Sequence, residues 1–178
     1  MSCKYFRPPT PPSLELPASL TVAEDETLSL SDVRVQDVDA RLGELEVVLA
    51  VNQGQLNVAN TEDLITFNQG ERTLTLEGNL TALNTALAGL TYTPDANYNG
   101  SDTLHLTVND QGNTGVGDAL SSTETLAITV TPVNDPPTEI SLDNNQIFEN
   151  EQGELVGEFS TADPDTGETF TYTVSNNR

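Results

Sequence analysis

The sequence predicts an all-β, Greek-key β-sandwich with one short helix, followed by a truncated second copy of the same repeat. Three observations support this prediction. Apolar and polar residues alternate with a period of two in several segments, Gly, Asn and Asp separate those segments, and one set of acidic motifs occurs twice. Alternation that is rich in Thr and Val is typical of half-buried strands, and several short strands separated by turns favour a sandwich.

The chain begins with a proline-rich stretch, residues 1–12, which we interpret as an extended linker or tail. Beyond it, Thr and other residues alternate with Leu, Val and Ile in the clearest strand candidates. These strands are expected near residues 47–51, 73–76, 103–108 and 125–130.

One segment departs from the period of two. Leu80, Leu83 and Leu87 have helical spacing, alanines lie between them, and Gly89 is a natural end for a helix. The sequence therefore predicts a short helix at about 80–88, crossing between two strands.

The segment 131–138 marks a domain boundary because two adjacent prolines, Pro136 and Pro137, cannot continue a central strand. We predict one repeat over 13–135 and the first part of a second over 136–178, with an alternating strand at 170–174. A partial sandwich exposes its apolar face and strand edges. Residues after about 140 are therefore expected to be poorly ordered, or to pair with another chain or with the rest of the repeat.

The charge of the chain restricts its partners. It has 28 acidic and 6 basic residues, a formal net charge of -22, so nucleic acid is not expected as a partner. Divalent cations would relieve the repulsion that such a charge creates. The sequence shows no nucleophile elbow, phosphate-binding loop or general-base His, so we do not expect an enzyme.

Cysteine content and hydropathy suggest a location. Cys3 is the only cysteine, so no disulfide can form within the chain. The N-terminus lacks the apolar region of a signal peptide, and no stretch is long and apolar enough for a transmembrane helix. We expect an extracellular or bacterial cell-surface protein whose export signal lies outside this chain.

Acidic residues recur at the predicted domain ends. Two glutamates follow the opening strand, an Asp-x-Asp follows a later strand, and an Asn-Asp lies in the linker. Calcium takes six to eight oxygen ligands of these kinds. The favoured site, at the junction of the two repeats, comprises Glu24, Glu26, Asn134, Asp135, Asp163 and Asp165. Weaker candidates are Asp37, Asp39, Asp110, Glu149 and Glu151.

Three further residues have a structural and a functional interpretation. Asp110 lies in an Asn-Asp-Gln-Gly turn, where shaping the turn is favoured over binding a metal. Asn79 and Asn99 each begin an Asn-x-Ser/Thr sequon, which carries little weight in a bacterial protein.

As a set, these motifs resemble cadherin repeats, and more closely the tandem cadherin-like repeats of large bacterial adhesins and hemolysin-type surface proteins. The motifs lie at residues 20–25, 36–40, 80–90, 92–100, 108–115 and 128–136. The resemblance implies tandem cadherin- or Ig-like sandwiches with calcium at their junctions. Pro132 and Pro136 stand where cadherin linkers place Asp and Asn, so fewer ions are expected than at a cadherin junction.

The expected function is that of a structural or adhesive repeat in which calcium makes the junctions rigid. The partners expected are calcium, neighbouring repeats, and a cell-surface protein or glycan. Two alternatives remain open: a carbohydrate- or protein-binding module, and a non-catalytic segment of a large secreted toxin.

Overall fold

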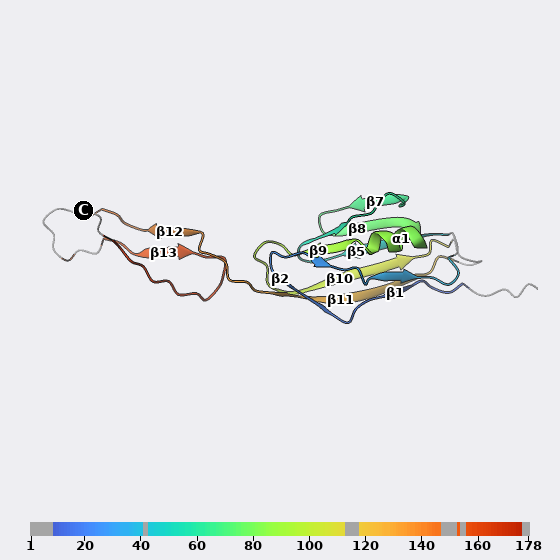
Figure 1. Ribbon diagram of the computed structural model, residues 1–178, viewed down its shortest axis with the longest axis horizontal. Coiled ribbons are helices and arrows are strands. Elements are labelled where there is room, and N and C mark those ends of the chain that lie inside the picture. The colour runs from blue at the N-terminus through green and yellow to red at the C-terminus, as the bar shows by residue number, and fades with distance from the viewer. Residues whose placement is uncertain (1–8, 41–42, 113–117, 147–152, 154–155, 176–178) are drawn as a thin grey trace, which may run out of the picture. The chain divides into compact units, whose positions relative to one another are not determined.

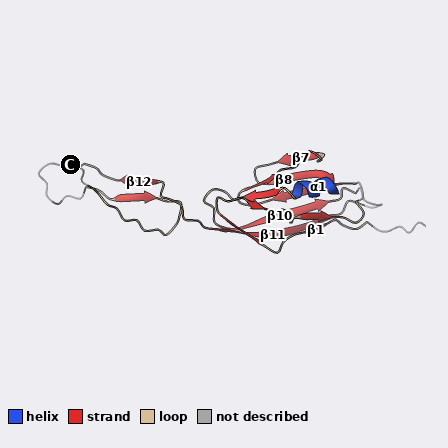
Figure 2. Cartoon of the chain, in the orientation of Figure 1, coloured by secondary structure: helices blue, strands red, loops and turns tan. Residues whose placement is uncertain are grey.

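A computed structural model describes residues 9–40, 43–112, 118–146, 153 and 156–175. The chain divides into two compact units, residues 1–132 and residues 133–178, and Figure 1 shows the strands and the helix, with labels where there is room. Figure 2 shows strands throughout the first unit together with one helical segment. No helix of the described residues is long and apolar enough to cross a membrane.

The described residues of the first unit form a β-sandwich of three sheets. The six-stranded sheet has the order β2 (Leu20–Ala23), β11 (Ser121–Thr131), β10 (Gly100–Asn109), β5 (Glu44–Ala50), β8 (Thr73–Asn79) and β7 (Thr66–Gln69). A three-stranded sheet has the order β3 (Leu28–Ser29), β9 (Leu90–Thr93) and β6 (Gln55–Val58). The third sheet pairs β1 (Ser13–Glu15) with β4 (Arg34–Gln36). The predicted all-β sandwich with one short helix is confirmed.

Alternating side chains from the sheets form one aliphatic core. Leu49 on β5, Leu74 on β8 and Leu106 on β10 are fully buried, as are Leu90 and Tyr92 on β9. Each buried side chain of this size contributes about 1.5–3 kcal/mol relative to an exposed one. The alternation therefore explains both the strands and the face that each strand buries.

Helix α1 (Leu80–Leu87) connects β8 to β9 and packs against β8, β4 and β5. Its buried side chains include Leu83 and Leu87, in agreement with the predicted helix at about 80–88. Asn79 is the N-cap residue, because its Oδ1 accepts the backbone N–H groups of Thr81 and Ala82 at 3.1 and 3.0 Å. These bonds satisfy two of the donors that every helix start leaves open.

The cap gives a first testable prediction. Asn79→Ala should lower the free energy of unfolding of the first unit by about 1 kcal/mol, because both accepted N–H groups lose their partner. Asn79→Asp should restore stability to within about 0.5 kcal/mol, since Asp caps as well as Asn. Urea denaturation followed by circular dichroism measures both values. Equal stability of the two variants would contradict this role for the cap.

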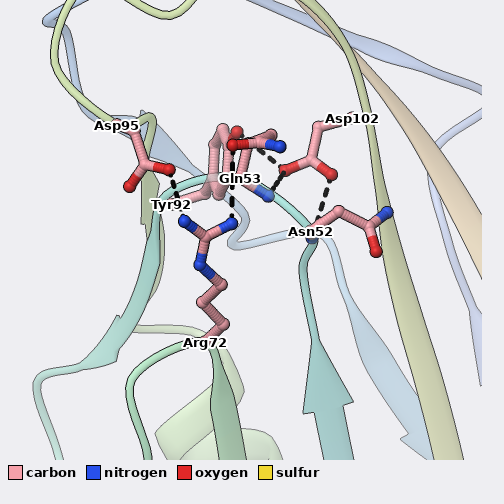
Figure 3. A network of polar contacts seen from close by, with 6 residues as sticks. All are labelled: Asn52, Gln53, Arg72, Tyr92, Asp95 and Asp102. Carbon is pink, nitrogen blue, oxygen red and sulfur yellow. Dashed lines mark hydrogen bonds and ion pairs between the residues drawn. The ribbon is translucent and has the colours of Figure 1, made fainter.

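A buried carboxylate anchors the turn between β5 and β6 (Figure 3). Asp102, 3% exposed, accepts the backbone N–H groups of Asn52 and Gln53, each at 3.1 Å, and that of Thr103 at 2.7 Å. The hydroxyl of Tyr92 donates to the same carboxylate at 2.9 Å. Asp102 thereby joins the start of β10 to a turn about 50 positions away in the sequence and to β9.

The rim of this network is more exposed. Burial, together with the hydrogen bond to Asp102, raises the pKa of Tyr92 well above its ordinary value, so the phenol stays protonated and donates. Arg72 pairs with Asp95 at 2.7 Å and donates to the side chain of Gln53 at 3.4 Å (Figure 3). Both members of the ion pair are more than one third exposed, so their pairing contributes less than the buried bonds to Asp102.

In the described residues of the second unit, β12 (Glu139–Leu142) pairs antiparallel with β13 (Phe159–Ala162). The sequence predicts that residues beyond about 140 are poorly ordered, or pair with another chain or with the rest of the repeat; in the structure, β12 and β13 pair with each other. The strand predicted at 170–174 is wrong, because those residues have no strand pairing. A strand needs a partner for its backbone N–H and C=O groups, and no described strand pairs with residues 170–174. This segment contacts β13 through a side chain, because the ring of Tyr172 stacks on that of Phe159 with centroids 5.0 Å apart.

The strand pair of the second unit has the same register as β1 and β4 of the first unit. Leu14 faces Val35 in β1–β4, and Ile140 faces Thr161 in β12–β13. In both units the second strand of the pair ends one residue before the Asp-x-Asp motif. The two acidic turns therefore occupy the same structural position.

Candidate functional site

In the first unit the Asp-x-Asp turn holds the segment that leads into β1. Asp37 Oδ1 accepts the backbone N–H groups of Asp39 and Ala40 at 2.9 and 3.0 Å. Asp39 Oδ2 accepts the backbone N–H of Thr10 at 2.9 Å. Two carboxylates thus lie together at a turn, and one of them fixes a residue of the proline-rich segment.

The second unit repeats this arrangement. Asp163 Oδ1 accepts the backbone N–H of Asp165 at 2.9 Å, and Asp165 Oδ2 accepts that of Asp135 at 2.6 Å. Asn134 Nδ2 donates to the backbone carbonyl of Asp135 at 3.1 Å. The linker residue held by the turn is Asp135 here and Thr10 in the first unit, so the second turn has one more carboxylate beside it.

Each turn buries a carboxylate oxygen. Asp37 Oδ2 and Asp163 Oδ2 are buried and accept no hydrogen bond from the described residues. Burial is the main cause of the raised pKa of Asp37. The neighbouring Asp39 carboxylate raises this pKa further, whereas the hydrogen bond from the Asp39 backbone N–H lowers it. A raised pKa means that the ionised carboxylate is disfavoured in the folded state, and this penalty is lost when Asp37 takes up a proton at low pH. A cation beside Asp37 Oδ2 would remove the same penalty at neutral pH.

The residues of the favoured junction set divide between the two units. Glu24 and Glu26 belong to the first unit, and the four other residues belong to the second. Glu24 is 2% exposed; its backbone N–H donates to the carbonyl of Thr131 at 2.9 Å, and its Oε2 accepts from Asn99 Nδ2 at 3.2 Å. Glu26 is exposed. The weaker candidates Glu149 and Glu151 lie outside the described residues.

Asp110 shapes the connection between β10 and β11. It is 1% exposed, and its Oδ1 accepts the backbone N–H groups of Gly112 and Leu120 at 2.9 and 2.7 Å. Its own N–H donates to the carbonyl of Leu120 at 3.0 Å. These contacts give Asp110 a structural use at the base of this hairpin.

Sequence reasoning missed the contact made by Thr10, because we predicted no site residue in that linker. A sequence signal for this contact was present, because each linker contains a pair of prolines, Pro11-Pro12 and Pro136-Pro137. The shared pair indicates that Thr10 and Asp135, the residues directly before it, occupy equivalent positions. Within the described ranges no group of three or more His, Cys, Asp and Glu side chains is arranged to hold a metal ion. Each turn instead offers a pair of carboxylates next to backbone groups.

Comparison with solved structures gives distant matches. The sixth cohesin of Acetivibrio cellulolyticus scaffoldin B, in complex with a mutant Cel5 dockerin, matches with 8% identity and a TM-score of 0.41, over 68% of this chain and 100% of that chain. A structure described as manganese lipoxygenase of Gaeumannomyces graminis and partial zonadhesin of Komagataella pastoris matches with 7% identity and a TM-score of 0.32. The match covers 67% of this chain and 48% of that chain. The search of curated proteins finds no significant match.

Residues 27–117 match the family model described as the Protein GAMETE EXPRESSED 2 domain. This match covers most of the sandwich, from just before β3 to the connection after β10. The resemblance to bacterial cadherin-like tandem repeats is therefore wrong as an assignment of family.

Proposed function

We propose that this chain, which belongs to the Protein GAMETE EXPRESSED 2 domain family, is a non-catalytic, extracellular repeat that binds calcium and acts in structure or adhesion. The family description points to a gamete-related setting. The proposed partners are calcium, neighbouring repeats, and a protein or glycan on a cell surface. Calcium is proposed to bind at the Asp-x-Asp turns and to fix the linker segments that those turns hold.

One observation carries the proposal: the same turn occurs in both units, each time with a buried carboxylate oxygen that accepts no hydrogen bond from the described residues. A buried oxygen of this kind is costly unless a donor or a cation reaches it. Asp37 and Asp163 would each offer this oxygen, and Asp39 and Asp165 would add a second carboxylate at the same turn. Carboxylate, backbone carbonyl and water oxygens together match what calcium binds.

The function follows from what each turn already holds. Asp39 and Asp165 accept the N–H groups of Thr10 and Asp135, so each turn contacts the segment that leads into its unit. A bound calcium ion supplies positive charge that draws the carboxylates of a turn together and offsets their repulsion in a chain of net charge -22. Linker and turn then form one stiffer structure, as an extended surface protein requires.

We predict a calcium-dependent rise in the melting temperature of the intact chain. Extracellular calcium modules bind at about 10⁻⁴–10⁻³ M, so millimolar calcium should add on the order of 1 kcal/mol per site. For units of this size that corresponds to a shift of about 2–8 °C. Thermal unfolding in calcium, in magnesium and in chelator measures the shift, and isothermal titration calorimetry gives the number of ions.

The variants are chosen to assign the shift to the turns. Asp37→Asn and Asp163→Asn should each remove the calcium effect of their own unit, whereas Asp63→Asn, which removes the same charge from an exposed position, should leave it unchanged. A flat calorimetric titration together with an unchanged melting temperature would refute calcium binding. An equal loss in all three variants would mean that calcium acts only through the net charge.

A further inference from the structure

The chain carries two Asn-x-Ser/Thr sequons, at Asn79-Leu80-Thr81 and Asn99-Gly100-Ser101. Sequons of this kind accept a glycan on the amide nitrogen of Asn in exported proteins, and the modified Asn lies on the surface. Both asparagines are exposed here, so exposure alone does not separate them. The hydrogen bonds of their side-chain amides do.

Asn79 can carry a glycan without losing its structural contacts. Its Oδ1 makes the two capping bonds, to the N–H groups of Thr81 and Ala82. Attachment of a sugar replaces one hydrogen on Nδ2 and leaves Oδ1 unchanged, so the N-cap of α1 persists. Asn79 also ends β8, next to a helix start whose Thr81 is exposed, so solvent surrounds the point of attachment.

Asn99 differs because its amide nitrogen is already engaged. Asn99 Nδ2 donates to Oε2 of Glu24, whose side chain is 2% exposed, at 3.2 Å. The following Gly100 has φ 138°, and a Cβ on it would lie 3.2 Å from the hydroxyl of Tyr98. That hydroxyl in turn donates to the carbonyl of Ser101 at 2.8 Å. A sugar on Nδ2 would replace one of its two hydrogens and place a bulky group beside the hydrogen bond to the buried Glu24 carboxylate, whereas the two contacts of the Asn79 side chain are made by Oδ1.

We propose that Asn79 is an N-glycosylation site of this protein and that Asn99 stays unmodified. In the reaction, Nδ2 attacks the anomeric carbon of a lipid-pyrophosphate-linked oligosaccharide. The new N–C bond replaces the C–O bond to the pyrophosphate, and the amide proton leaves with the lipid pyrophosphate. The proposal rests on the extracellular location given in the proposed function, because only an exported chain meets this donor.

The test is secretion of the full chain from a eukaryotic host behind a signal peptide. Enzymatic deglycosylation in ¹⁸O water, followed by peptide mass spectrometry, marks each formerly glycosylated Asn as a labelled Asp. The wild type should carry one glycan, at Asn79. Thr81→Ala, which keeps the Asn79 cap but breaks the sequon, and Asn79→Asp, which keeps a capping oxygen, should both abolish it. Asn99→Gln should leave the glycan unchanged.

The outcomes separate this inference from the calcium proposal. A secreted, folded chain without a glycan on Asn79 would overturn the inference, as would equal occupancy of Asn79 and Asn99. Either result leaves the calcium-dependent melting shift as a separate measurement. Conversely, a chain that carries the Asn79 glycan but shows no calcium response would support glycosylation and refute calcium binding.

Discussion

Asp102→Ala is expected to lower the free energy of unfolding of the first unit by about 3–5 kcal/mol, which is a large part of the total for a domain of this size. The change removes the acceptor of four donors: the backbone N–H groups of Asn52, Gln53 and Thr103 and the hydroxyl of Tyr92. A buried donor that loses its partner costs about 1–3 kcal/mol, and water can relieve only the donors near the surface. Urea denaturation followed by circular dichroism measures the loss.

Two companion variants divide this effect. Tyr92→Phe keeps the buried ring and removes a single hydrogen bond, so it should cost about 1–2 kcal/mol. Asp95→Asn removes the charge of a partly exposed ion pair with Arg72 and should cost less than about 1 kcal/mol. If Asp102→Ala were no more harmful than Asp95→Asn, the carboxylate would not be the anchor of the β5–β6 turn.

Asp102 also shows what the sequence could and could not reveal. The period of two predicted the strand, since Leu104, Leu106 and Val108 alternate with polar residues and are all buried. Asp102 continues the same buried face, and an acid at a core-facing position was the signal that it needs internal partners. Two of its partners are backbone N–H groups about 50 positions away, and the sequence does not mark such groups.

The candidate site was predictable in part for a similar reason. The Asp-x-Asp motifs are visible as side chains, and the structure places both at the same point of the repeat. The linker contacts come from the backbone N–H groups of Thr10 and Asp135, and every residue except proline supplies such a group. A sequence therefore shows the acceptors of this site but not its donors.

The assignment of family failed where the fold prediction succeeded. Alternating strands, glycine turns and short acidic turns follow from how a sandwich buries one face and closes its hairpins, so unrelated sandwiches share them. Such features specify an architecture, which is confirmed here. They do not identify the protein family, which is given by the family-model match at residues 27–117.

Gly54→Ala is expected to destabilise the first unit by about 3 kcal/mol, through the backbone and not through a lost contact. Gly54 is buried in the turn after β5 and has φ 88°, which costs a residue with a Cβ about 1–2 kcal/mol. A Cβ at this position would collide with the carbonyl oxygen of Thr93 and would lie 2.8 Å from Cα of Pro94. Both are backbone atoms at the end of β9, so no side-chain rotation relieves the collision, and overpacking adds about 1–3 kcal/mol.

Gly100→Ala is the matched control for Gly54→Ala, because it lies in the same unit and also has a positive φ, 138°. The nearest heavy atom to its added Cβ is the hydroxyl of Tyr98 at 3.2 Å, at the far end of a side chain that can move. It should therefore show the conformational cost alone, about 1–2 kcal/mol. Chemical denaturation of both variants gives the difference. If Gly54→Ala lowers the free energy of unfolding more than Gly100→Ala does, the difference is the cost of the collision between the β5–β6 turn and β9. If the two variants lose the same stability, this turn moves away from β9 without cost. In that case Asp102 could not hold the turn as rigidly as its four accepted hydrogen bonds indicate.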